Sequence, residues 1–370
     1  MTKRKDTISR RHLLKGTGAG AAAVAFPTIL TSRKASAAVI KLTARDPGGP
    51  YVAAYGAAYY EPFNKKFAGK IEVTGVIGKH EPTSQIKAMV DTGTYTWDVA
   101  LLSESAHNLL RDAGDGYLAK LENHSHPDVM EIPEKFKSDF MQGVDVYGTV
   151  LGYRTDIYPS KARVPDQGWK DVWDVSGIPG VRALRKNAYD TFEQALIADG
   201  VPAGEEYEWL RAKGFDRAFT SLDKLKPEID IWWTGGAQTS QLLSTGEVDM
   251  CPTWNGRAQA AIDGGAPVAI SWNESIYNFE GWCILKGTPH LEAAREFVTF
   301  CANAKQQALQ AAHISYGPVN PNAYDHIDKE RAKVLSTNPD FLPLMHPADN
   351  DFWAENKDRA QEEFNAWLVG

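Results

Sequence analysis

Residues 249–287 read DMCPTWNGRAQAAIDGGAPVAISWNESIYNFEGWCILKG, and this stretch decides the class of fold. Its pattern predicts a strand, a turn, a short helix, a second strand, a polar loop and a third strand. Trp254 ends the first apolar run, immediately before Asn-Gly, and Glu280 stands just before the apolar run Trp282–Leu285. In open α/β sheets, ligands bind beyond the carboxyl ends of the strands. The stretch therefore predicts an indole and a carboxylate at the strand ends of an α/β sheet.

An indole and a carboxylate in such a place suit a cation. The ring face attracts a positive charge, and the carboxylate accepts a charge-assisted hydrogen bond. A second interpretation stays open at this point, in which Trp254 only packs in the core and Glu280 is solvated. The rest of the chain bears on this choice.

Strand and helix patterns alternate on both sides of this stretch. The apolar runs predict strands at 39–44, 71–76, 98–102, 147–153 and 229–233, and helical periodicity predicts helices at 81–92, 191–198, 237–243 and 291–312. Such alternation is typical of a mostly parallel sheet with helices on both faces. After position 37 the chain has 333 residues, which is more than a single hydrophobic core usually organises. We therefore expect two lobes.

The first 37 residues have the features of an export signal. Ser9–Lys15 reads SRRHLLK, which matches a twin-arginine motif, and it precedes a weakly apolar Gly/Ala-rich segment and the cleavage site Ala35-Ser36-Ala37. We therefore expect export by the twin-arginine translocase, cleavage near Ala37 and a mature protein in the periplasm. The apolar segment is short and broken by glycines and Pro27, so a membrane anchor is not expected.

Removal of this signal makes the protein strongly acidic. The full chain has 40 Lys and Arg and 47 Asp and Glu residues; without the eight basic and one acidic residues of 1–37, the net charge is −14. An acidic protein repels nucleic acid and attracts cations, so no nucleic-acid partner is expected.

The sequence contains none of the motifs expected of an exported enzyme or a metalloprotein. We find no nucleophile elbow, zinc-protease motif, phosphate loop or paired-cysteine spacing, so we expect no cofactor, metal or catalytic residue. His124-Ser125-His126 lies in a polar loop, where solvated histidines are the expected state. Cys251 and Cys283 could form a disulfide, although buried free thiols are favoured. An exported hydrolase or oxidoreductase remains the alternative class.

Four segments together resemble a known family. They are 246–256 with Trp254-Asn255-Gly256, 279–287 leading into a helix, Trp-Lys-Asp-Val-Trp-Asp at 169–174, and Tyr316–Asn320. In their order and spacing the chain resembles the periplasmic solute-binding proteins of ABC importers, most of all the spermidine/putrescine-binding type. The resemblance covers essentially the whole mature chain.

This resemblance implies a type II periplasmic binding protein. Each of its two lobes would be a mixed, mostly parallel sheet flanked by helices, with lobe 1 formed by 38–149 plus 280–324 and lobe 2 by 150–279 plus 325–370. Two crossing strands, near 149–152 and 277–280, would form the hinge. The implied function is capture of a small amine-bearing solute, such as putrescine or spermidine, for ABC importer permease subunits in the inner membrane. The protein would be a monomer and not an enzyme.

The resemblance also implies a ligand-binding site. Trp254 and Tyr316 match aromatic positions, and Glu280 and Asp190 match acidic ones. Ser103 and Glu104 lie in a first-lobe loop that usually touches ligand. Three residues at or just after strand ends complete the predicted site: Tyr51, Trp233 and Gln238.

Three departures from the polyamine pattern loosen the identity of the ligand. A second acid expected near Asp190 is replaced by Asn187, with Arg185 close by; the aromatic expected before Glu280 is Asn278; and the 46–51 loop contains no Trp. A diamine, or a zwitterion such as a γ-amino acid whose carboxylate meets Arg45 or Arg185, therefore becomes an alternative ligand. The arginines could also face solvent, as most arginines do.

Overall fold

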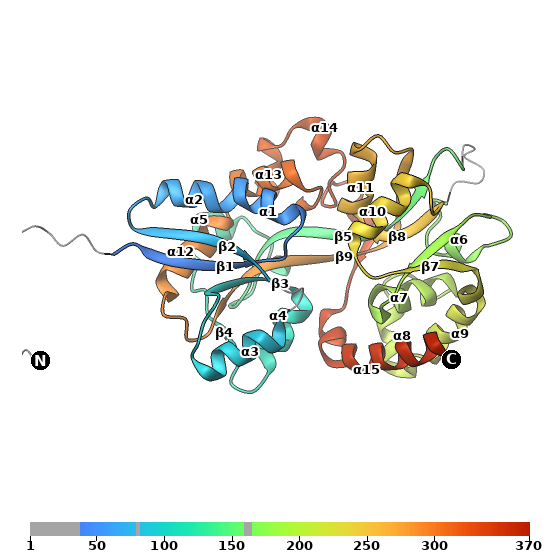
Figure 1. The fold of residues 1–370 in the computed structure, drawn as a ribbon, viewed down its shortest axis with the longest axis horizontal. Helices are drawn as coiled ribbons and strands as arrows, with labels where there is room; N and C mark the ends of the chain where they lie inside the picture. The colour runs from blue at the N-terminus through green and yellow to red at the C-terminus, as the bar shows by residue number, and fades with distance from the viewer. Residues whose placement is uncertain (1–37, 79–81, 159–164) are drawn as a thin grey trace, which may run out of the picture. The chain divides into compact units, whose positions relative to one another are not determined.

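Two long antiparallel strands, β5 (Gln142–Arg154) and β9 (Val268–Leu285), form the axis of the fold. They pair along almost their whole length, from Gln142 opposite Trp282 to Arg154 opposite Val268, with two register shifts (Figure 1). The computed structural model describes residues 38–78, 82–158 and 165–370, so the predicted signal peptide lies outside the described residues.

Three main strands lie on each side of this pair, in the order β2-β1-β3-β9-β5-β8-β6-β7. The β1–β3 half consists of β1 (Ile40–Asp46), β2 (Ile71–Ile77) and β3 (Val99–Ser103), which pair in parallel with one another. The β6–β8 half consists of β6 (Arg182–Arg185), β7 (Ile229–Trp233) and β8 (Met250–Trp254), also parallel. Both halves meet the central pair through antiparallel pairing. Short strands β4 (Leu118–Ala119), β10 (Gly317–Pro318) and β11 (Met345–Pro347) attach to β9 or β5.

Helices alternate with these strands, as the sequence predicted. The main helices that follow strands of the β1–β3 half, or follow β9, are α1 (Pro50–Tyr55), α2 (Glu61–Lys66), α3 (Thr83–Thr92), α4 (Glu104–Asp112), α12 (Leu291–Cys301) and α13 (Ala304–His313). Those of the β6–β8 half and the C-terminus are α7 (Ala188–Ala198), α8 (Glu206–Lys213), α9 (Asp216–Leu225), α10 (Gly236–Thr245), α11 (Asn255–Asp263) and α15 (Asn350–Val369). Short helices are α5 (Pro127–Met130), α6 (Lys170–Trp173) and α14 (Lys329–Ala332).

Separate hydrophobic cores stabilise the two halves. In the β1–β3 half, one core includes Phe63, Trp282 and Phe297. In the β6–β8 half, the largest core includes Phe192 of α7 together with Phe364 of α15. The C-terminal helix therefore packs on α7, far from it in sequence. Which residues move together as lobes stays a prediction.

Two predictions about secondary structure were wrong. The polar loop predicted within 249–287 lies within the single strand β9, although residues 272–275 fall at a register shift and have no partner on β5. Trp169 uses the carbonyl and carboxylate of Glu274 in this irregular part as acceptors. The single helix predicted at 291–312 is two helices, because Asn303 has extended backbone and its side chain accepts from the Lys305 N–H, which starts α13. Cys251, Cys283 and Cys301 are free and buried.

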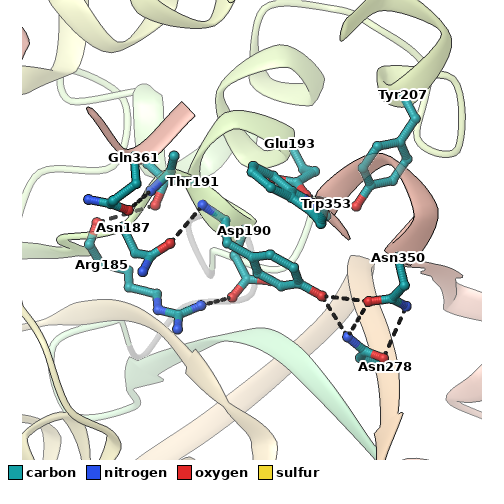
Figure 2. Close-up of polar contacts among 12 residues, drawn as sticks. Arg185, Asn187, Asp190, Thr191, Glu193, Tyr207, Asn278, Asn350, Trp353 and Gln361 are labelled. Atoms are coloured by element: carbon teal, nitrogen blue, oxygen red, sulfur yellow. Dashed lines mark hydrogen bonds and ion pairs between the residues drawn. The ribbon is translucent and has the colours of Figure 1, made fainter. Parts of the chain in front are cut away.

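A carboxyl group lies deep in the core of the β6–β8 half. Glu193 of α7 is fully buried, and its Oε1 accepts from Tyr207 Oη at 2.7 Å and from Trp353 Nε1 at 2.6 Å. Figure 2 shows these side chains together. Burial, followed by the nearby charge of Asp190, raises the pKa of Glu193 from near 4.5 to about 8.

This shift makes the stability of the protein depend on pH. Between about pH 5 and pH 8 the folded protein keeps a proton on Glu193 that the unfolded chain releases, so the free energy of unfolding falls as pH rises and levels off above about 8. Glu193→Gln keeps an acceptor for both donors but cannot ionise. As pH rises from about 5 to about 8, we expect the melting temperature of Glu193→Gln to increase relative to that of the wild type. The control Glu362→Gln changes an exposed residue, so its melting temperature should depend on pH as that of the wild type does. The same pH dependence for Glu193→Gln would contradict the prediction.

Candidate ligand-binding site

A partly open cavity of about 160 Å³ lies where strands of both halves end. The side chains around it come from segments far apart in the sequence: Pro47, Gly48, Tyr51, Tyr147, Arg185, Asn187, Tyr189, Trp254, Arg257, Glu280, Tyr316 and Lys357. Several of them directly follow the carboxyl ends of β1, β6 and β8, where ligands bind in open α/β sheets. This cavity is the candidate site.

Glu280 contributes the only carboxylate among the described residues that line the cavity. It is 8% exposed, and Tyr51 Oη donates a hydrogen bond to its Oε2 at 2.5 Å. The rings of Tyr51 and Tyr147 lie 6.0 and 5.6 Å from the ring of Tyr316, so aromatic edges and faces surround this end. Burial raises the pKa of Glu280, and the hydrogen bond from Tyr51 and the charges of Arg45 and Arg257 oppose that shift. A buried carboxylate among tyrosines can bind an ammonium group.

Another part of the site is built around Arg185. Its Nη1 lies 2.6 Å from Asp190 Oδ2, and its guanidinium carbon lies 5.2 Å from the centre of the Trp254 ring and 5.7 Å from that of Trp233. Figure 2 shows Arg185 and Asp190 joined in this way. We predicted that a cation of the ligand would lie against the ring of Trp254. In the structure the guanidinium of Arg185 lies over this ring instead.

The local backbone explains why Asp190 reaches Arg185. Asn187 caps the start of α7 by accepting from the Tyr189 N–H at 2.9 Å, and Asp190 then adopts a left-handed φ of 70°. A non-glycine residue in this conformation costs on the order of 1–3 kcal/mol unless its surroundings hold it. The ion pair with Arg185 is such a constraint, because Asp190 is only 2% exposed.

Loss of Arg185 should therefore destabilise the fold. Arg185→Met leaves the carboxylate of Asp190 buried without its partner, so we expect the free energy of unfolding to drop by about 3–5 kcal/mol. The double variant Arg185→Met/Asp190→Asn removes the orphaned charge and should recover most of this loss in urea denaturation. Equal stabilities of the single and double variants would show that the ion pair does not hold this turn.

Tyr189 supplies a ring that the sequence did not lead us to expect. Asn278 Nδ2 donates to its hydroxyl at 2.6 Å, and the hydroxyl lies 3.2 Å from Asn350 Oδ1 (Figure 2). The aromatic residue missing at position 278 is thus replaced in effect by Tyr189, which Asn278 helps to position. No local signal marks this, because β9, α7 and α15 meet only in the folded chain.

Two cations in the cavity wall were also missed. Arg257 stands in the first turn of α11, three residues after Trp254, and its Nε is buried without a hydrogen-bond partner among the described residues. Its position just after a strand end was a usable signal. Lys357 comes from α15, and burial lowers its pKa. Arg45 is 3% exposed and its Nη1 donates to the Leu101 carbonyl, so it is buried but does not line the cavity.

The structure brings four of the nine predicted site residues into the cavity wall: Tyr51, Trp254, Glu280 and Tyr316. Their contact with a ligand stays a prediction. The other five serve local structure and lie outside the wall. Ser103 caps α4, Glu104 accepts from Asn350 Nδ2 at 2.8 Å, and Gln238 accepts from the Thr234 N–H at 3.2 Å. Trp233 is buried edge-on to Trp254, and Asp190 lies behind Arg185.

No group of three or more potential metal-ligating side chains occurs in the described part of the chain. His124 lies 3.2 Å from Asp139 and is largely solvent-accessible, as predicted for this loop.

Comparison with known proteins supports this assignment of the fold. A family described as "Bacterial extracellular solute-binding protein" matches residues 58–341, most of the chain. The chain belongs to this family. A twin-arginine signal sequence matches residues 7–27, so the protein is exported to the periplasm. Within the described residues, no helix is long and apolar enough to cross a membrane.

Individual proteins are similar to this chain to different degrees. The gamma-aminobutyric acid-binding protein of Pseudomonas aeruginosa is 35% identical over 89% of this chain and 91% of its own length. An ABC transporter substrate-binding protein from Bradyrhizobium japonicum superposes with a TM-score of 0.80, at 34% identity, over 89% of this chain and 99% of that one. The spermidine/putrescine-binding periplasmic protein of Escherichia coli is more distant, at 24% identity over 60% of this chain and 62% of its own.

The solute-binding protein described here is thus the substrate-binding component of an ABC transporter and not an enzyme. Its partners are a small ligand and the permease subunits of an ABC importer. Its predicted monomeric state stays a prediction.

Proposed function

We propose that the protein binds a zwitterionic ω-amino acid of the γ-aminobutyrate type for import. The observation that carries this proposal is the distribution of charge in the cavity wall. The wall contains the carboxylate of Glu280 among tyrosines and three cations, Arg185, Arg257 and Lys357. Arg185 is paired with Asp190, and Arg257 is close enough to Glu280 to act on its ionisation. An ammonium group suits the carboxylate, and a ligand carboxylate suits the cations.

A polyamine fits this wall less well. Putrescine and spermidine carry an ammonium group at both ends, so the second one would face cations instead of a carboxylate. Two like charges about 4 Å apart repel by about 4 kcal/mol at the effective dielectric constant of a protein surface, which is half of the roughly 8 kcal/mol needed for micromolar binding. The name of the Pseudomonas aeruginosa relative agrees with the zwitterion, and the polyamine-binding relative is the more distant one.

Isothermal titration calorimetry with matched ligands tests the proposal. γ-Aminobutyrate and putrescine have similar lengths but differ in the charge of one end, while butylamine and butyrate each lack one end. We expect micromolar binding of γ-aminobutyrate and at least tenfold weaker binding of the other three. Tighter binding of putrescine would support the polyamine alternative and overturn the proposal. Refolding the protein from denaturant before the titration removes any ligand carried through purification.

A further inference from the structure

A second carboxyl group lies directly behind Glu280 and has no role in the site described so far. Asp145 of β5 is the register partner of Glu280 of β9 in the central antiparallel pair. Directly opposite residues in such a pair point to the same face with Cβ atoms about 4.5–5.5 Å apart. Asp145 is 1% exposed and does not line the cavity. Two buried carboxyl groups are therefore neighbours at the amine end of the cavity.

The surroundings of the two carboxyl groups differ. The groups around Asp145 are neutral donors: Tyr55 Oη lies 3.3 Å from its Oδ2, and Gln310 Nε2 donates to the same oxygen. Its Oδ1 is buried without a hydrogen-bond partner in the described part of the chain. Glu280, by contrast, has a charged neighbour in Arg45 of β1 and another in Arg257 of α11. Cations favour ionisation of Glu280 over that of Asp145.

The other ionisable groups around the pair do not change this order. Tyr51, Tyr59, Tyr147 and Tyr316 keep their protons because burial raises their pKa values. Asp46 of β1 lies beside Arg45, and its Oδ1 accepts a hydrogen bond from the Gly48 N–H at 2.7 Å. Burial and then the charge of Glu280 raise the pKa of Asp145 well above its ordinary value. Two adjacent buried carboxylates cannot both ionise without a large cost.

We propose that Asp145 carries a proton at neutral pH, so that the Asp145–Glu280 pair presents a single negative charge to the ligand. Because Asp145 is neutral, the charge of the amine end is that of Glu280 alone, −1. One ammonium group neutralises that charge, which matches a zwitterion with a single amine. When no ligand is bound, the protonated Asp145 also avoids repulsion between two neighbouring carboxylates. In its ligand arm this inference rests on the proposed function.

Two arms test the inference. In ligand-free protein with ¹³C-labelled aspartate carboxyl groups, NMR titration should show a protonated carboxyl at pH 7 that disappears in Asp145→Asn. Glutamate is unlabelled, so the protonated Glu193 does not contribute. If every aspartate carboxyl of the wild type titrates in the ordinary acid range, or if the signal survives in Asp145→Asn, the inference is wrong whatever ligand the protein binds.

The second arm measures affinity for γ-aminobutyrate at pH 7. Asparagine resembles a protonated aspartate in shape and charge, so Asp145→Asn should bind within about threefold of the wild type, whereas Glu280→Gln should lose at least about tenfold. Below the pH at which Glu280 takes up a proton, wild type and Asp145→Asn should lose affinity together. A tenfold loss in a folded Asp145→Asn variant would show that Asp145 supplies a charge and would overturn the inference. No binding by the wild type would contradict the proposed function alone, because the NMR arm still decides the inference.

Discussion

Glu280→Gln is expected to weaken γ-aminobutyrate binding by on the order of 10- to 100-fold while leaving the protein folded. The variant removes a charge-assisted hydrogen bond to the ammonium group, which contributes about 1.5–3 kcal/mol. The glutamine side chain still accepts from Tyr51 Oη, so the local contact survives. Because burial opposes ionisation of Glu280, loss of its charge should keep or raise the melting temperature.

Calorimetric titration and thermal unfolding of the same preparation measure both effects. Glu61→Gln makes the same chemical change at an exposed position at the start of α2 and should leave both values unchanged. An unaltered dissociation constant for Glu280→Gln would remove Glu280 from the site. A collapse of the melting temperature would instead assign it a structural role.

Arg257→Met is expected to reverse the preference of the site. Arg257 lines the cavity, and its charge acts on both Glu280 and Tyr316. Its buried Nε has no hydrogen-bond partner among the described residues, so a ligand carboxylate is a fitting acceptor. Replacement by an apolar side chain of similar length removes about 1.5–3 kcal/mol of charge-assisted binding to that carboxylate. It also removes repulsion toward a second ammonium group.

Competition between γ-aminobutyrate and putrescine on this variant is the measurement. We expect the dissociation constant for γ-aminobutyrate to rise on the order of 10- to 100-fold and that for putrescine to fall. Lys329→Met deletes the same unit of charge from the exposed surface of α14 and controls for long-range electrostatics. If Arg257→Met raises the dissociation constants of both ligands equally, the arginine supports the shape of the cavity and does not distinguish ligands by charge.

The sequence was informative wherever the signal for a residue was local. Trp254 was predicted at a strand end, and it ends β8 and lines the cavity, because a strand that stops exposes its last side chains at the edge of a sheet. Glu280 also lines the cavity, but it lies inside β9 and not at a strand end, so that part of its prediction was wrong. The family resemblance placed Ser103 and Glu104 in the site; in the structure Ser103 caps α4 and Glu104 accepts from Asn350. A residue at a strand end can serve the following helix as readily as a ligand.

Other parts of the site depend on contacts between segments far apart in the chain. Lys357 reaches the cavity because the aromatic face of α15 packs on the core around α7, and Tyr189 is aimed by an asparagine from β9 and another from α15. Asp145 becomes relevant only through its register opposite Glu280, and a shift of one residue would turn it to the other face of the sheet. Periodicity and spacing contain none of this information.

The sequence by itself determined the export signal, the alternation of strands and helices, the family, and an aromatic residue at the end of a strand, since each depends on short segments. Only the tertiary structure decided which charges meet in the cavity. Arg185 is bound to Asp190 and lies over the ring of Trp254, and Arg257 and Lys357 line the same cavity as Glu280. The balance of those charges supports the proposed zwitterion over a polyamine, because electrostatic energy depends on distance in space and not on distance along the chain.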